Sequence, residues 1–351
     1  MVKLNRLIFL LYFLLLAFGL LYVASSSVVE AYRATGNQWQ YVLKQLTWLI
    51  ISLFAYLVVS HTSPKMIFYY SSTFYFFSFL LLVVVLFAPA ISGAKRWLDL
   101  GFFSLQPSEF IKTALLIYLP YLHFQAKISW DKFLIYGLVP VILILIQPDF
   151  GTASVIIILT LLLYFLLGFS IKNLVKILPL IIPLIFFYVI SAPYRMERLK
   201  TFFIATHDPQ GSSYQSRQSL IGIGSGGFWG LGIGQSRQKY NFLPESSTDS
   251  IFSIIAEETG TIGSSLLLFI YFMLIIVIFR ISANLSTPLH AIVVAGIGSL
   301  ISIQSLINLS ALTGLLPLTG VPLPFVSYGG SSLLNFSLSL GVISSLVKHD
   351  H

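Results

Sequence analysis

Residues 222–260 combine glycines, bases and acids in an order that could support chemistry. Asp249 stands just before an apolar segment, and Glu257 and Glu258 lie within the first turns of that segment. Carboxylates at the mouth of a membrane-spanning helix are costly, so their presence indicates a function. An ionised carboxylate in such a position can act as a general base toward a substrate hydroxyl. Asp249 is therefore the candidate catalytic residue.

A structural role for Asp249 is the alternative. Residues 246–249 fit a capping box, with Ser246 as the N-cap and Asp249 at the third helical position. The two roles are compatible, because the positive end of a helix favours an ionised carboxylate. Glu257 lies two turns further along the predicted helix, and Glu258 points about 100° away from it. At most one of them can face a cavity with Asp249, and the other needs a buried or cationic partner.

A second group of charged residues surrounds Pro107, which suits the first turn of a helix. Lys95 and Arg96 precede this helix, and adjacent bases at headgroup depth are suited to bind a phosphate. Glu109 and Lys112 are one turn apart at the start of the helix. They either contribute to the phosphate site or form a local ion pair that neutralises itself.

Residues 193–248 form a large polar loop that carries further cations, Arg195, Arg198 and Arg217. Its glycines between positions 222 and 234 are too dense for a regular helix. One interpretation is a backbone that approaches a ligand closely and offers N–H groups to an anion. The other is a flexible surface loop. In a separate turn, Asp149 either caps the following helix or belongs to the site.

Composition excludes a soluble protein. Of 351 residues, 57% are hydrophobic and 9% are charged, whereas a soluble domain has about 25% charged residues. The net charge of +8 is explained by cationic loops that orient a membrane protein, so we expect no nucleic-acid partner. The absence of cysteine excludes disulfides and thiolate sites, and the histidines lack ligand spacing, so we assign no structural metal.

The apolar segments predict an all-α polytopic protein formed by a single domain, residues 1–351, with about ten membrane spans. The predicted spans are 7–27, 42–61, 67–88, 108–124, 133–147, 153–169, 174–192, 250–280, 288–312 and 329–347. The fifth and sixth are short and could tilt. The termini and the short even-numbered loops carry Lys and Arg and, among the acids, only Asp131 and Asp350. Short basic loops stay in the cytoplasm, so both termini are expected inside and the 193–248 loop outside.

The ordered motifs resemble the SEDS family (shape, elongation, division and sporulation) of peptidoglycan polymerases, over nearly the whole stretch from residue 93 to residue 332. The motifs that carry the resemblance are Lys95-Arg96-Trp97, Gln106-Pro107-Ser108-Glu109 with Lys112, Gln147-Pro148-Asp149-Phe150-Gly151-Thr152-Ala153, Tyr214-Gln215 with Gln218-Ser219, Gly224-Ser225-Gly226-Gly227, Phe242-Leu243-Pro244-Glu245 with Thr248-Asp249, Ala256-Glu257-Glu258, and Pro322-Leu323-Pro324-Phe325 with Ser327-Tyr328-Gly329-Gly330-Ser331-Ser332. Two positions depart from the family pattern: Ser250 replaces the usual phenylalanine and Gly222 the usual alanine. The motifs at 214–215 and 236–239 are closer to the division branch than to the elongation branch.

The resemblance implies glycosyl transfer on lipid II, a disaccharide-pentapeptide joined through pyrophosphate to a polyprenyl chain. Asp249 would be the general base in an inverting displacement. The expected substrate-binding residues are Lys95, Arg96, Glu109, Lys112, Arg195, Arg198, Arg217, Gln218 and Ser219. The expected orienting residues are Asp149, Glu245, Glu257 and Glu258. A divalent cation, Mg²⁺ or Mn²⁺, could assist the pyrophosphate, although no ligand cluster in the sequence demands one.

The resemblance also implies partners: a class B penicillin-binding protein as the transpeptidase, and other membrane proteins of the divisome or elongasome. Two rival functions remain open at this point, a lipid II flippase and a structural recruiter of cell-wall synthases. A transporter places its site near the midplane between repeated halves. This chain shows no such repeat, and its ionisable residues gather at the outer end of the spans. We expect the protein to be a multi-pass protein of the bacterial cytoplasmic membrane, with its active site on the extracytoplasmic face.

Overall fold

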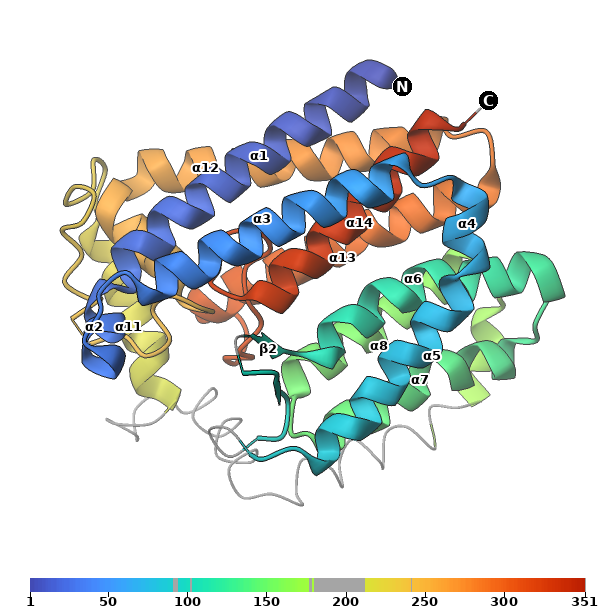
Figure 1. Ribbon diagram of the computed structural model, residues 1–351, viewed down its shortest axis with the longest axis horizontal. Coiled ribbons are helices and arrows are strands. Elements are labelled where there is room, and N and C mark those ends of the chain that lie inside the picture. Colours follow the sequence, from blue (N-terminus) through green and yellow to red (C-terminus); the bar gives the residue numbers. More distant parts are fainter. Residues whose placement is uncertain (91–93, 102, 177–178, 180–211, 241, 351) are drawn as a thin grey trace.

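The computed structural model describes residues 1–90, 94–101, 103–176, 179, 212–240 and 242–350. Helices, most of them long, make up most of these parts of the chain (Figure 1). They are α1 (Val2–Ser26), α2 (Val28–Thr35), α3 (Gln40–His61), α4 (Pro64–Tyr69), α5 (Ser71–Val84), α6 (Pro107–Ala126), α7 (Trp130–Ile146), α8 (Phe150–Leu166), α11 (Ser212–Ser225), α12 (Ile251–Asn284), α13 (Pro288–Leu312) and α14 (Gly330–Lys348). A 3₁₀ turn, η1 (Val85–Phe87), extends α5.

The all-α membrane fold is confirmed. Among the described residues, α1, α3, α12, α13 and α14 are long and apolar enough to cross a membrane. The predicted span at 174–192 falls mostly outside the described residues, and each of the other nine overlaps a helix. The fifth and sixth spans are indeed short, because α7 and α8 have 17 residues each. Both termini lie at the same end of the bundle (Figure 1), as an even number of crossings requires.

Helix α14 lies at the centre of the bundle, packed against α1, α3, α6 and α13 (Figure 1). Small residues allow this close packing, as is usual where helices associate in a membrane. At Gly341, an added Cβ would lie 3.1 Å from the carbonyl oxygen of Tyr56 in α3. A second group, α5 to α8, packs beside this core, and α13 joins the two groups through contacts with α6 and α8.

The segments between the helices differ from the predictions in two places. A short antiparallel pair, β1 (Leu98–Asp99) and β2 (Ser104–Leu105), precedes α6, where no strand was expected. In addition, the loop before α12 is not irregular throughout. Its residues 212–225 form helix α11, which includes Gly222 and Gly224, so the prediction that these glycines exclude a helix was wrong.

Candidate active site

Asp249 lies in the turn that precedes α12, and its side chain is half-buried. The predicted capping box is wrong, because α12 begins at Ile251 with Ser250 as its N-cap and without a side-chain capping bond. The hydroxyl of Thr248 instead joins two acids, donating to Glu245 Oε2 at 2.9 Å and to Asp249 Oδ1 at 3.1 Å. The carboxyl group of Asp249 therefore belongs to a turn and not to a helical first turn.

Main-chain contacts hold this turn firmly. Asn308 of α13 donates to the carbonyl oxygen of Asp249 at 2.7 Å. The Ser327 hydroxyl donates to the carbonyl of Thr248 at 2.6 Å, and the N–H of Tyr328 donates to the carbonyl of Ser247 at 2.9 Å. Three consecutive carbonyls, at 247–249, are thus held by α13 and by the segment before α14. A base that must meet a substrate hydroxyl in one geometry needs such support.

Lys112 and Glu109 form the local ion pair that was the alternative to a phosphate site. Lys112 Nζ lies 2.8 Å from Glu109 Oε1 and 2.8 Å from Gln304 Oε1. Both charged side chains are only 1% exposed. This buried pair bears out the ion-pair alternative, and a contact of Lys112 with a phosphate stays a prediction. The contact of Lys112 with α13 makes it a part of the scaffold beneath the site.

Arg96 contacts the turn that ends at Asp149. Arg96 donates to the carbonyl oxygens of Gln147, at 3.3 Å, and of Pro148. Asp149 is the N-cap of α8, where its Oδ1 accepts from the N–H of Thr152 at 3.0 Å. Asp149 thus has the capping role. Lys95, by contrast, is exposed.

The segment 319–321 brings this turn next to Asp249. A Cβ added at Gly151 would lie 2.4 Å from the carbonyl oxygen of Thr319, so the two backbones touch. One residue further on, a Cβ at Gly320 would lie 4.0 Å from Asp249 Oδ2. The start of α8, which directly follows the Arg96–Asp149 turn, and the Asp249 turn therefore lie beside the same short stretch of backbone.

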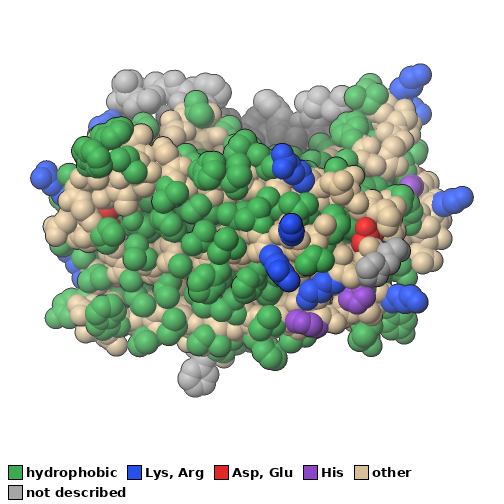
Figure 2. All heavy atoms as spheres, turned by 90° about the horizontal axis from the view of Figure 1, so that it is seen from above, with side chains coloured by type: hydrophobic (Ala, Val, Ile, Leu, Met, Phe, Trp, Pro, Cys, Tyr) green, Lys and Arg blue, Asp and Glu red, His purple; other side chains and the backbone are tan. Residues whose placement is uncertain are grey.

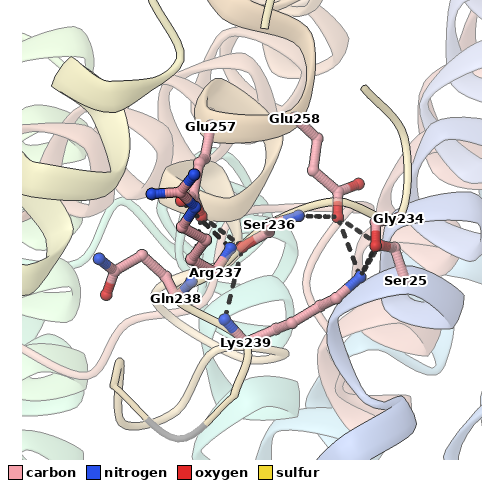
Figure 3. Close-up of polar contacts among 8 residues, drawn as sticks. All are labelled: Ser25, Gly234, Ser236, Arg237, Gln238, Lys239, Glu257 and Glu258. Atoms are coloured by element: carbon pink, nitrogen blue, oxygen red, sulfur yellow. Dashed lines mark hydrogen bonds and ion pairs between the residues drawn. The ribbon is translucent and has the colours of Figure 1, made fainter. Parts of the chain in front are cut away.

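Glu257 and Glu258 point toward the loop around residues 234–239 and hold it against α12 (Figure 3). Both side chains are 1% exposed. Glu257 accepts from the N–H groups of Arg237 and Gln238, each at 3.2 Å, and from the Ser236 hydroxyl. A carboxylate that accepts several N–H bonds fixes the conformation of the donor loop.

Glu258 uses a cation for the same purpose. Its Oε1 lies 3.4 Å from Lys239 Nζ, accepts from the Ser25 hydroxyl of α1 at 2.6 Å, and accepts from the N–H of Ser236 at 3.3 Å (Figure 3). The sequence required a buried partner for one of the two adjacent acids. In the structure both have buried partners, Glu257 in the 236–238 loop and Glu258 in Ser25, Ser236 and Lys239.

The glycine-rich run lies across a break in α12. Gly260 has a non-helical backbone, with φ of 63° and ψ of −160°. The break leaves main-chain N–H and C=O groups of α12 without partners in the helix, and residues 227–232 provide the missing hydrogen-bond partners. Thr261 and Ile262 donate to the carbonyls of residues 227 and 228 at 2.9 and 3.4 Å, and Leu231 and Gly232 donate to those of residues 257 and 258, each at 3.0 Å.

Glycine is required there for close approach between two stretches of this chain. A Cβ added at Gly226 would lie 2.0 Å from the carbonyl oxygen of Ala256, and one at Gly230 would lie 2.2 Å from that of Glu258. The two interpretations drawn from the sequence, a cradle for an anion and a flexible loop, do not describe this segment. Its N–H groups at 231 and 232 already have partners within the protein.

Helix α11 carries the remaining predicted side chains of the loop. Gln215 donates to the Ser250 hydroxyl at 3.0 Å and so ties α11 to the start of α12. Arg217 is exposed, Gln218 is half-buried and Ser219 is buried. Arg195 and Arg198 lie outside the described residues.

Glu30 is an acid of this region that sequence reasoning did not identify. It lies in α2, and its Oε2 accepts from the Ser247 hydroxyl at 3.3 Å. Burial raises the pKa of the Glu30 carboxyl, the charge of Glu245 raises it further, and the bond from Ser247 lowers it. The sequence offered one signal, an acid beside the end of the first span, but nothing in it related residue 30 to residue 247.

A divalent cation that assists the pyrophosphate stays a prediction. In the part of the chain that the structure describes, no group of three or more His, Cys, Asp or Glu residues could hold a metal ion. We therefore assign no step to Mg²⁺ or Mn²⁺ in the chemistry below.

The geometry can now be compared with known proteins. The family described as "Cell cycle protein", FtsW/RodA/SpoVE, matches residues 5–351. The chain belongs to the FtsW/RodA/SpoVE family. A probable peptidoglycan glycosyltransferase FtsW of Coxiella burnetii is 39% identical, over 94% of this chain and 92% of that protein. Stage V sporulation protein E of Bacillus subtilis is 35% identical, over 74% of this chain and 72% of that protein.

Solved structures support the fold of this FtsW/RodA/SpoVE member over almost its whole length. A chain from "Structural coordination of polymerization and crosslinking by a peptidoglycan synthase complex" superposes with a TM-score of 0.79 at 25% identity, covering 98% of this chain and 97% of the other. The rod shape determining protein RodA of Thermus thermophilus superposes with a TM-score of 0.71 at 24% identity, covering 98% and 96%. The multi-pass membrane architecture is thus that of the family.

Proposed function

We propose that this protein is a peptidoglycan glycosyltransferase that polymerises the glycan of lipid II during cell division. The observation that carries the proposal is the support of the Asp249 turn. Three successive carbonyls, at 247–249, are held from two other segments, in a chain whose relatives over 94% of its length include a probable peptidoglycan glycosyltransferase FtsW. The site belongs to the outer face of the bacterial cytoplasmic membrane, because the opposite end carries both termini and the short basic loops.

Asp249 acts as the general base. Its carboxylate takes the proton from the acceptor sugar hydroxyl while that oxygen attacks the anomeric carbon of the donor. The bond from this carbon to the diphosphate oxygen breaks, and its electron pair leaves with polyprenyl diphosphate. A single displacement inverts the anomeric centre. The Thr248 hydroxyl, 3.1 Å from Asp249 Oδ1, orients the carboxylate.

Cations near the Arg96–Asp149 turn stabilise the departing diphosphate. Negative charge develops on the leaving group, and fixed positive charge lowers the barrier to its departure. Arg96 is fixed by the carbonyls of residues 147 and 148, and Lys95 beside it is exposed and able to reach a phosphate. Arg217 is exposed on α11 and serves as a further cation. Lys112 acts as a positioning residue, through Gln304.

The partner of this protein is a class B penicillin-binding protein, which supplies the transpeptidase. Other membrane proteins of the division machinery join the same assembly. The likeness to a chain of a peptidoglycan synthase complex supports such an assembly. Crosslinking needs its own active site, because it is an acyl transfer, whereas the base assigned here deprotonates a sugar hydroxyl.

Replacement of Asp249 by asparagine tests the function. The protein, copurified with its transpeptidase partner, is incubated with lipid II in detergent, and glycan strands are measured on gels. Asp249→Asn should lose at least about a hundredfold in rate, since general-base catalysis contributes about 10²–10⁴-fold. The asparagine keeps an oxygen for Thr248, so folding should be unchanged. Polymerisation by this variant at the wild-type rate would contradict the assignment.

The matched control is Asp99→Asn. Asp99 is exposed, and among the described residues its carboxylate accepts from the N–H of Gly101 at 2.9 Å, so this variant should keep full activity.

The rival function, a lipid II flippase, is tested with the wild-type protein in vesicles, by measuring whether lipid II crosses the bilayer. Translocation without polymer formation by the wild type would refute the enzyme and support the transporter.

A further inference from the structure

A cavity of about 240 Å³ opens at the end of the bundle that carries both termini, far along the chain from the Asp249 turn. It lies between the start of α1, the end of α3 and the end of α14. Each of these helices contributes a basic side chain to its lining, namely Arg6, His61 and Lys348. No acidic side chain lines it. Basic side chains gather at this end of the bundle (Figure 2), and around this hollow Arg6 and Lys348 bring positive charge from two separate helices.

Arg6 is the base that the local structure does not explain. It lies near the start of α1, where the helix dipole disfavours a cation, and the first turn of α1 contains no acid. Within the part of the chain that the structure describes, the ion pairs are Lys112–Glu109, Lys239–Glu258 and His290–Asp350, and Arg6 is in none of them. Its guanidinium offers five N–H donors in a geometry that suits a phosphate.

Lys348 leaves hydrogen-bonding capacity in the same cavity. Lys348 Nζ donates to the carbonyl of Ser60 at 3.1 Å, which leaves two of its three donors. Asn5 joins two of the lining helices, because its amide donates to the Ser344 hydroxyl of α14 at 3.0 Å. The cavity therefore presents cationic donors that a phosphate would satisfy.

The remaining wall is apolar and continues onto the outer surface of the bundle. Phe9, Tyr56 and Leu57 line the cavity. Phe9 is 42% exposed and Leu57 is 50% exposed, so both also contact what surrounds the bundle, the hydrocarbon of a bilayer. A charged end next to an apolar wall matches a molecule with an anionic head and an acyl chain. A soluble anion would leave the apolar wall unused.

We propose that this cavity binds an anionic phospholipid of the inner leaflet, one whose only headgroup charge is its phosphate, as in phosphatidylglycerol. The phosphate lies between Arg6 and Lys348. One acyl chain follows Phe9 and Leu57. The site is separate from the glycosyl-transfer site and its existence does not depend on that function.

Lipid retention on the delipidated, full-length protein tests the proposal. Dioleoyl-phosphatidylglycerol and dioleoyl-phosphatidylcholine are titrated in detergent, and bound lipid is counted by native mass spectrometry. The wild type should retain phosphatidylglycerol in preference. Because each cation near an anionic lipid contributes roughly fivefold in affinity, Arg6→Gln with Lys348→Gln should lose about 25-fold. Arg6→Gln alone, which disturbs no hydrogen bond of the protein, should lose about fivefold.

The matched control removes the same charge from the same end of the bundle. Lys3 and Lys65 are exposed and lie outside the cavity lining, so Lys3→Gln with Lys65→Gln should change binding less than about twofold. Equal loss in this control would show only general attraction of basic loops to anionic lipid, and would refute the site. Equal retention of the two lipids, or competition by inorganic phosphate at the same concentration as lipid, would also refute it.

Discussion

Gln304 and Asn308 lie one helical turn apart on α13, and their amides donate to the carbonyls of two adjacent residues, Pro322 at 3.1 Å and Val321 at 2.8 Å. Each amide also has a second partner. Gln304 Oε1 accepts from Lys112, and Asn308 Nδ2 donates to the carbonyl of Asp249. The buried ion pair of α6 and the turn that carries the proposed base are therefore supported by one face of one helix.

Asn308→Leu tests this support. The substitution removes both hydrogen bonds of Nδ2 and leaves the carbonyls of Asp249 and Val321 without that donor. Hydrogen bonds between membrane helices contribute about 0.6–2 kcal/mol each, so we expect the free energy of unfolding to fall by about 1–4 kcal/mol. Polymerisation should fall further than stability accounts for, because the Asp249 turn loses its position.

The comparison variant is Asn284→Leu, which removes an exposed amide at the end of α12 that donates only to the carbonyl of Arg280. Thermal unfolding and glycan synthesis are measured on both proteins in detergent. Full activity in Asn308→Leu would show that the Asp249 turn is positioned by other contacts.

Lys112→Met should destabilise the protein strongly. It leaves the Glu109 carboxylate buried without its cation, and breaking a buried ion pair on one side costs about 3–5 kcal/mol. Adding Glu109→Gln should restore part of this loss, since the second change removes the uncompensated charge. Denaturant unfolding of the two single variants and the double variant gives the coupling free energy. Additive losses would contradict a direct pair. Lys132→Met, on an exposed side chain, controls for lost charge.

Gly230→Ala should disrupt the contact at the break in α12. Gly230 has φ of +81°, and its added Cβ would lie 2.2 Å from the carbonyl oxygen of Glu258. Gly234 is a close match because it has the same φ of +81° but open space around its Cβ position. Gly234→Ala should therefore cost only the backbone strain, about 1–3 kcal/mol. Gly230→Ala should lower the unfolding temperature well below that of Gly234→Ala, and equal values would refute the contact.

Glu30 makes stability depend on pH. Its pKa is raised in the folded protein, so the folded state holds the proton more tightly than the unfolded state. The stability that this provides is present below the usual glutamate pKa of 4.5 and is lost as the pH rises through the folded-state value. Glu30→Gln removes a buried charge but keeps an acceptor for Ser247. Relative to the wild type, this variant should gain unfolding temperature from pH 4 to pH 7.5.

The difference between variant and wild type is the quantity to follow, because other titrating groups cancel in it. Glu245→Gln should also gain unfolding temperature relative to the wild type as the pH rises, but by less than Glu30→Gln. The reason is that the charge of Glu245 raises the pKa of Glu30 less than burial does. A difference between Glu30→Gln and the wild type that stays constant across this pH range would contradict the raised pKa.

The sequence by itself determined that this is a membrane protein, that it is helical, that both termini lie on one side of the membrane, and that Asp249 stands just before a long apolar helix. These properties depend on the amount and spacing of apolar residues, and on where charges interrupt them, both of which are local in the chain. The same reasoning identified the short fifth and sixth spans, and it offered the ion pair of Glu109 with Lys112 as one of two alternatives, because an i,i+3 spacing is also local.

Only the tertiary structure decided which polar groups meet. Glu257 and Glu258 look like site acids in sequence, yet their partners are main-chain groups, a serine hydroxyl and a lysine of the preceding loop, together with the Ser25 hydroxyl of α1. The contact of Glu30 with Ser247 spans 217 positions, and no periodicity predicts it. The glycines suggested a ligand cradle, because a pattern shows that a backbone approaches something closely but not what it approaches. Here it approaches α12, since a broken helix leaves main-chain groups that must find partners inside a membrane protein.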